Sequence, residues 1–173
     1  MPPELIPPAV PIGMIDFEAE ITSAWVAVVT AQVAPLSVTT VEERHPQGEE
    51  NAIRQFRRDE LPAVWCSSAP NGTSLEACGV LGLHYTIRWG VLTENGDAKE
   101  ARREHERIRQ NIVALFASYQ FQGNSDFLSS GNPVSFNYEQ TIGTPTQQNK
   151  SPYRVTSENE MRLMVLYPST PTE

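Results

Sequence analysis

The sequence predicts an α+β fold, in which a mainly antiparallel twisted sheet carries two amphipathic helices packed on one face, with long loops and an extended N-terminal arm. Three observations favour this fold class. Apolar residues recur at helical spacing in segments 16–32 and 98–118. Residues 74–93 alternate apolar and polar side chains with the period of two that a β-strand requires. Shorter apolar segments bounded by turn residues are typical of further strands.

The N-terminal segment 1–15 is predicted to be an extended arm. Five prolines lie within the first eleven residues, and each proline fixes φ and removes an amide donor. The arm is either a frayed tail or a segment that docks on a neighbouring subunit. Residues 16–173 then form a single domain, the usual outcome for a chain of 173 residues.

Both helices have a recognisable beginning. Asp16 is the expected N-cap of the first helix, and Pro35 prevents much continuation beyond its end. Its apolar stripe consists of Phe17, Ile21, Trp25 and Val28.

Asp97 and Glu100 form a variant of the capping box before the second helix. The stripe of that helix is Ala101, His105, Ile108, Ile112, Leu115 and Tyr119, and its polar side holds Lys99, Arg102, Arg103, Glu106, Arg107 and Gln110.

The first strand is expected at 61–66, and the turn signal Asn71-Gly72 joins it to segment 74–93 as a hairpin. Twenty extended residues would span ~65 Å, which is more than a globular sheet usually holds. The long strand must therefore bend, break or project, and its glycines are the expected places: Gly79, Gly82 and Gly90.

Two more strands are expected, at 134–142 and at 153–167. The last strand contains the polar residues 157–159, which predict an interruption or a turn there. Segments 37–60 and 143–152 are polar and are interpreted as long connections.

The composition argues against several classes of protein. The formal net charge is −8, and a general nucleic-acid binder needs a basic surface instead. An acidic protein that guides nucleic acid without gripping it is not excluded. The N-terminus lacks the basic residue of a signal peptide, and no apolar stretch approaches the ~20 residues of a spanning helix. No membrane association is expected.

Chemical motifs are absent, so we expect no enzyme activity, cofactor or metal. His45, His84 and His105 lack the spacing of zinc ligands. Cys66 and Cys78 would lie nearly opposite each other in the hairpin, as buried thiols of a reducing compartment. A minor alternative is an enzyme whose residues converge from distant positions, for instance His84 with Glu76 and Arg88 on one strand face.

The candidate functional residues are interface residues. The second helix carries five basic residues between Lys99 and Arg109, in an otherwise acidic chain. Its polar side is either a solvated face with internal ion pairs or a docking face for an acidic partner, including a neighbouring copy. The candidates on it are Arg102, Arg103 and Arg107, and the polar face of the long strand adds His84 and Arg88.

The order of elements resembles that of the tail terminator proteins of tailed bacteriophages. The resemblance covers about residues 16–168, and the arm and the long segments 37–60 and 119–152 extend beyond the compact family pattern. The segments that carry it are Phe17–Gln32, Asp59-Glu60-Leu61-Pro62-Ala63-Val64, His84–Trp89, Asp97–Ser118, Val134–Ile142 and Met161–Tyr167.

The resemblance implies a structural virion protein of the phage neck. Such a subunit would form a ring, expected to be hexameric, that caps the tail tube, ends tail polymerisation and joins the tail to the head connector. The implied partners are other copies of the chain, the tail tube protein, and connector or sheath proteins, with assembly in the host cytoplasm. The net charge of −8 adds the hypothesis that the lumen of the ring is acidic, so that genomic DNA passes through it without specific binding. The alternatives are another neck or head-completion subunit, or a non-viral assembly adaptor.

Overall fold

The computed structural model describes most of the chain after residue 15. The described ranges are 16–44, 56–76, 79–119, 126–136 and 140–168. The predicted arm, residues 1–15, lies outside them.

The predicted α+β fold class is confirmed. The strands are β1 (Thr40–Glu43), β2 (Ala63–Glu76), β3 (Val80–Asn95), β4 (Val134–Phe136), β5 (Thr146–Gln147) and β6 (Tyr153–Pro168). They form one sheet in the order β1-β2-β3-β6-β4, with β5 also paired to β6. Every pair of strands is antiparallel except β1 and β2, which are parallel.

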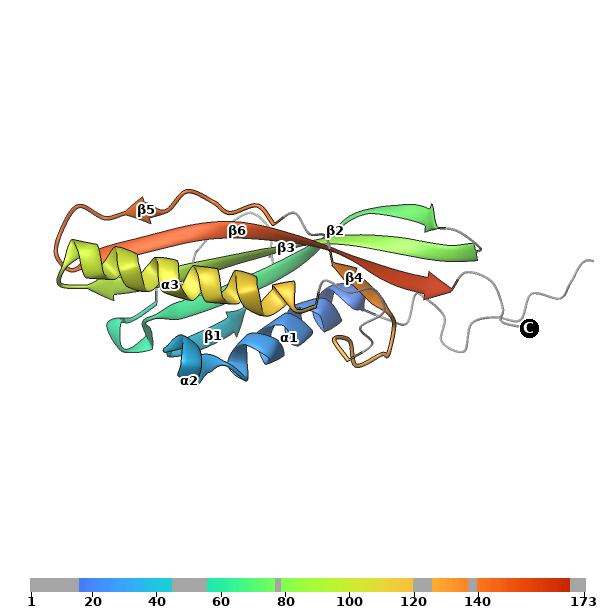
Figure 1. Ribbon diagram of the computed structural model, residues 1–173, viewed down its shortest axis with the longest axis horizontal. Coiled ribbons are helices and arrows are strands. Elements are labelled where there is room, and N and C mark those ends of the chain that lie inside the picture. The colour runs from blue at the N-terminus through green and yellow to red at the C-terminus, as the bar shows by residue number, and fades with distance from the viewer. Residues whose placement is uncertain (1–15, 45–55, 77–78, 120–125, 137–139, 169–173) are drawn as a thin grey trace, which may run out of the picture.

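Helices α1 (Phe17–Thr30) and α3 (Ala98–Ala117) lie side by side on one face of this sheet (Figure 1). Asp16 caps α1 by accepting a hydrogen bond from Ala19 N at 3.0 Å, and Asp97 caps α3 by accepting one from Glu100 N at 2.9 Å. The short helix α2 (Val33–Leu36) follows α1. Both predicted N-caps are therefore confirmed.

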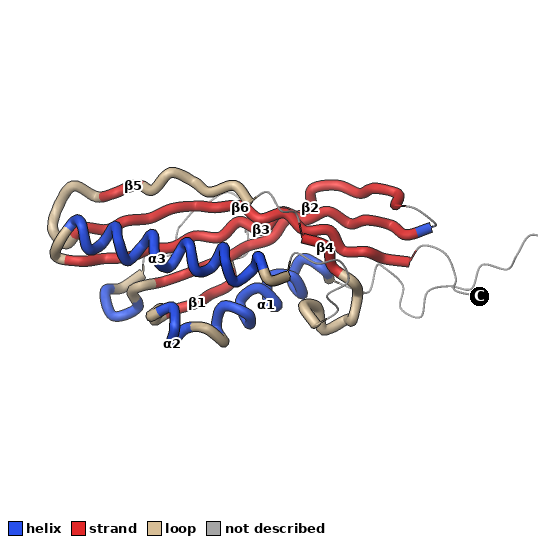
Figure 2. Tube along the Cα trace, viewed as in Figure 1, coloured by secondary structure: helices blue, strands red, loops and turns tan. Residues whose placement is uncertain are grey.

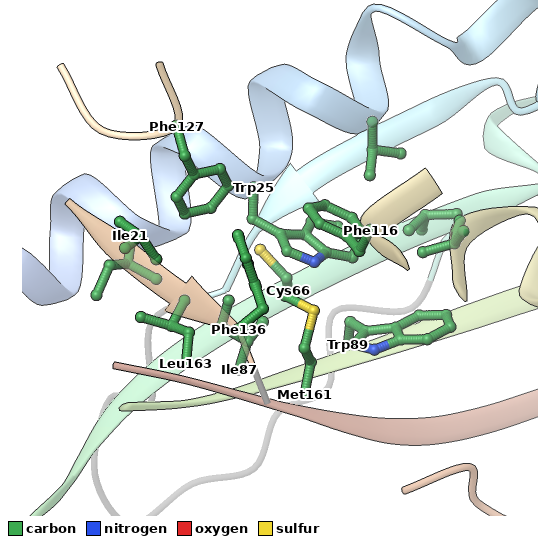
Figure 3. Packing of buried hydrophobic residues seen from close by; sticks show 14 of the residues in the cluster. Ile21, Trp25, Cys66, Ile87, Trp89, Phe116, Phe127, Phe136, Met161 and Leu163 are labelled. Atoms are coloured by element: carbon green, nitrogen blue, oxygen red, sulfur yellow. The ribbon is translucent and has the colours of Figure 1, made fainter. Parts of the chain in front are cut away.

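The core lies between the two helices and the sheet. Trp25 of α1 is fully buried and stacks on Phe116 of α3, with ring centroids 5.3 Å apart (Figure 3). Trp89 of β3 packs against Trp25 from the sheet side, at 6.1 Å. The stripe predicted for the second helix is partly wrong, because Phe116 is buried while Leu115 is only half-buried. The three aromatic rings join both helices to the sheet.

The predicted hairpin at Asn71-Gly72 is wrong, because β2 continues through it to Glu76. The pairing of β2 with β3 slips by one residue between Pro70 and Gly72, and Gly72 has φ +143°. The glycine thus serves a β-bulge rather than a turn. Cys66 lies opposite Trp89 instead of Cys78, which is outside the described residues.

The predicted interruption of the last strand is also wrong. β6 is continuous, and residues 157–159 pair with residues 89–91 of β3. Asn159 is buried there, where its amide accepts a hydrogen bond from Gly143 N at 3.1 Å and donates one to Trp89 O at 3.4 Å. A polar residue in this strand is therefore compatible with the core, because its hydrogen bonds are satisfied.

The segments predicted as connections contain short elements. Segment 37–60 contains β1 and a 3-10 helix, η2 (Arg58–Glu60). The predicted strand 134–142 is divided into β4 and a single bridge between Thr141 and Glu160, and the loop after it contains β5. These pieces run antiparallel to β6, so β6 is covered on both of its edges for much of its length.

Gly90 of β3 lies directly against the indole of Trp65 on β2, and this close packing provides a test of the fold. A Cβ atom at Gly90 would lie 2.1 Å from Trp65 Cζ2. We expect Gly90→Ala to lower the free energy of unfolding by about 1–3 kcal/mol, because the indole must move. Urea denaturation measures the loss. Gly96→Ala is the matched control, since a Cβ there meets no atom within 4 Å, and equal losses for the two variants would contradict the packing.

Candidate assembly surfaces

The sheet extends well beyond the helices at one end (Figures 1 and 2). We call this end of the sheet the lobe and define it as residues 70–76 of β2, 80–86 of β3 and 162–168 of β6. Its β6 part is partly covered, because β4 pairs with residues 163–165 and Phe17 of α1 packs against Tyr167, with ring centroids 6.1 Å apart. The three strands remain paired throughout the lobe. Leu75 lies opposite Leu81, and Leu81 lies opposite Tyr167. The lobe is therefore a continuation of the sheet rather than a loop.

One edge of the lobe is open within the described part of the chain. β1 pairs only with residues 63–66 of β2, so no described strand covers the outer edge of residues 70–76. Pro70 and the bulge beside it limit pairing at the start of this edge. Leu75, further along, has 78% of its surface exposed. The alternation of apolar and polar residues in segment 74–93 gives no sign of this exposure, because it predicts one apolar face without showing where the helices stop covering it.

His84 lies in the lobe in a small polar cluster. Its Nε2 is 2.7 Å from Ser74 Oγ, and the same hydroxyl donates to Glu76 Oε1 at 2.5 Å. Gly82 leaves room for this cluster, since a Cβ there would lie 2.7 Å from Ser74 Oγ. A side chain at position 82 would therefore displace Ser74 or Met164, whose Sδ would lie 2.6 Å from the added Cβ.

The cluster does not have the arrangement of a nucleophilic triad. Such a triad needs the acid to bind and orient the imidazole, whereas here Glu76 and His84 both bind the hydroxyl of Ser74. Arg88 is exposed and pairs instead with Glu160, at 3.3 Å. The structure thus joins His84 to Glu76 through Ser74 and leaves Arg88 apart from them.

The second candidate surface is the polar side of α3, which we call the basic stripe. Its members line a shallow groove of about 610 Å³: Lys99, Arg102, Arg103, Glu106, Arg107, Gln110 and Asn111. The grouping predicted from helical spacing is confirmed, with Asn111 added. The three candidate arginines are exposed and lie together on α3, whereas His84 lies on β3 within the lobe.

Glu106, the only carboxylate of the stripe, already forms an ion pair with Arg109 of the same helix. Arg109 binds both of its oxygens, at 2.7 and 2.8 Å, and also donates to Gly143 O at 2.6 Å. Arg109 itself is buried, so of the five basic residues of the helix it is the one that does not contribute to an exposed docking face. Its charge is satisfied by Glu106, which leaves the other cations of the stripe to set the surface charge.

Two of those cations have contacts of their own. Arg103 Nη1 lies 3.2 Å from Glu100 Oε1 in a largely exposed pair, which is weak in water. Arg107 Nη2 donates to Leu36 O at 2.8 Å and so ties α3 to the end of α2. A hydrogen bond to a carbonyl leaves the positive charge of Arg107 in place.

Other possible sites are less developed. Among the described residues, no group of three or more His, Cys, Asp or Glu is placed to hold a metal ion. Cys66 is buried, and burial raises the pKa of its thiol well above the ordinary value, which makes it a poor nucleophile. No helix within the described ranges is long and apolar enough to cross a membrane.

No protein-family model matches the chain. No curated protein matches it. A solved structure whose name describes no function has a similar fold, with a TM-score of 0.51 and 18% sequence identity. The similarity covers 88% of this chain and 96% of that chain. At this identity the comparison shows a shared fold and nothing about activity.

Proposed function

We propose that the protein is a structural subunit of a tailed phage, forming a ring that caps the tail tube, ends tail polymerisation and joins the tail to the head connector. The observation that supports this best is the lobe, the end of the sheet that reaches past the helices, where no described strand covers the outer edge of residues 70–76 and Leu75 is exposed. An open edge offers backbone donors and acceptors to a strand from another chain.

In this proposal the partners are further copies of the chain, the tail tube protein, and connector or sheath proteins. The ring is hexameric, belongs to the virion and assembles in the host cytoplasm. DNA passes through its lumen without specific binding, consistent with a formal net charge of −8. The protein acts through surfaces and has no catalytic residue. Another neck subunit or a non-viral adaptor could use the same lobe, and the experiment below distinguishes these cases.

The test combines electron microscopy with a tube-growth assay. The purified protein should form rings, and its addition to polymerising tail tube protein from the same phage should shorten the tubes. Rings that leave tube length unchanged would favour another neck position or an adaptor. A particle that stays monomeric alone and with tube protein would overturn the proposal.

Leu75→Asp tests the lobe directly. We expect it to reduce ring formation at least tenfold, because it places a charge where an apolar contact forms, while thermal unfolding of the subunit stays nearly unchanged at an exposed site. Ile142→Asp is the matched control, because Ile142 is also an exposed large apolar residue, at 49%, and lies outside the lobe. Equal effects of the two variants on ring formation would contradict a role for the lobe.

A further inference from the structure

Charge is unevenly distributed between the two helices that cover the sheet. The chain contains no Lys or Arg before Arg44. Helix α1 begins with Asp16, Glu18 and Glu20, and no basic residue follows in that helix. The basic stripe lies on α3. In Figure 1, α1 begins beside the root of the lobe, whereas α3 begins at the end of the molecule farthest from the lobe. The helical face therefore has an acidic and a basic region at different places along its length.

We propose that the basic stripe of one copy docks against the acidic beginning of α1 in a second copy. The inference rests on the proposed ring, and it names the surfaces through which neighbouring subunits meet. A second copy is the expected partner of the stripe because the charges are complementary. The protein itself supplies both the cationic and the anionic surface.

The cationic side is available for such a contact. Lys99 and Arg102 form no ion pair or side-chain hydrogen bond within the part of the chain that the structure describes, and Arg102 is exposed. Glu106, which could cancel their charge, is bound by Arg109. Docking therefore requires few existing contacts to be broken.

The anionic side is available as well. Asp16 is exposed and uses one oxygen to cap Ala19 N. The side chain of Glu18 has no hydrogen-bond or ion-pair partner among the described residues. Glu20 differs, because it accepts hydrogen bonds from Ser129 Oγ and Ser130 N. Asp16 and Glu18 are thus the expected acceptors.

The same charges disfavour a contact in which the stripe of one copy meets the stripe of another. A two-fold dimer built on the stripe would place Arg102 and its neighbours against their own copies, and like charges that face each other oppose association. A contact between two different surfaces pairs opposite charges. Repeated from copy to copy, such a heterologous contact closes a ring when its rotation allows.

A charge swap tests this inference. We expect Arg102→Glu and Glu18→Lys each to weaken self-association about tenfold at low ionic strength, where exposed charges are least screened. The double variant should recover most of the wild-type association, because the swapped charges attract again. Analytical ultracentrifugation at several salt concentrations measures these effects, and circular dichroism checks that each variant is folded.

Two control variants change the charge elsewhere by the same amount. Lys150→Glu and Glu158→Lys alter exposed residues outside both surfaces and should leave association close to wild type. The inference is overturned if the double variant is no better than the single ones, or if the controls weaken association equally. If the wild-type protein forms rings and the substituted proteins form them equally well, only this inference fails. If the wild-type protein does not associate, the proposed function fails with it.

Discussion

Replacing Trp25 with alanine is expected to lower the free energy of unfolding by about 3–5 kcal/mol. The indole is fully buried and stacks on Phe116 from the other helix, and Trp89 closes the same space from the sheet. Removing it leaves a cavity at the point where both helices meet β3, and the surrounding backbone cannot collapse to fill it. Urea denaturation followed by circular dichroism measures the loss.

Trp25→Phe is the matched control for this variant. It keeps an aromatic ring against Phe116 and removes an indole nitrogen that has no hydrogen-bond partner among the described residues. We expect it to cost less than half as much as alanine. An alanine variant that loses under about 1 kcal/mol would mean that the core is not organised around this residue.

Lowering the pH from 7 to 4 is expected to remove about 3 kcal/mol of stability through His105 alone. The imidazole is fully buried, and burial, reinforced by the nearby Arg109 and Arg102, lowers its pKa from 6.5 to about 4, while Glu106 acts in the opposite direction. The folded protein therefore holds the neutral ring, whereas the unfolded chain takes up a proton near pH 6.5. The contribution is complete above pH 6.5 and is lost as the pH falls from there toward 4.

His105→Leu separates this effect from the titration of carboxylates. Leucine has a similar size and no proton to bind, so the variant should lose about 3 kcal/mol less than the wild type between pH 7 and pH 4. Urea midpoints at both pH values give the comparison. Equal losses in the two proteins would show that the imidazole is protonated in the folded state without cost.

The helices were predictable from the sequence because their signals are local. Asp16 and Asp97 bind amides three residues away, and the spacing of apolar residues brought Trp25 inside. The same spacing placed Arg102, Arg103 and Arg107 together on α3. These features depend on residues within one or two turns, so no distant part of the chain has to be known.

The strand boundaries depended on distant partners and were harder to predict. A glycine with positive φ suits a turn and a bulge equally, and only the register with β3 shows that Gly72 belongs to a bulge. Asn159 is buried because Gly143 and Trp89 satisfy its amide. Arg109 is buried because Glu106 and Gly143 surround its guanidinium. In each case the residue type taken alone predicts a different position: a turn for the glycine, and the protein surface for Asn159 and Arg109.

The continuity of β2, β3 and β6 has a mechanical consequence. Each strand runs from the helix-covered body into the lobe without a break in pairing, apart from the bulge at Pro70–Gly72. A pull on the tip of the lobe along the strands therefore acts across many backbone hydrogen bonds at once, because those bonds lie perpendicular to the strands. The hydrogen bonds between the strands would be loaded together in shear, instead of breaking one after another. The force would also be transmitted directly to the core around Trp89.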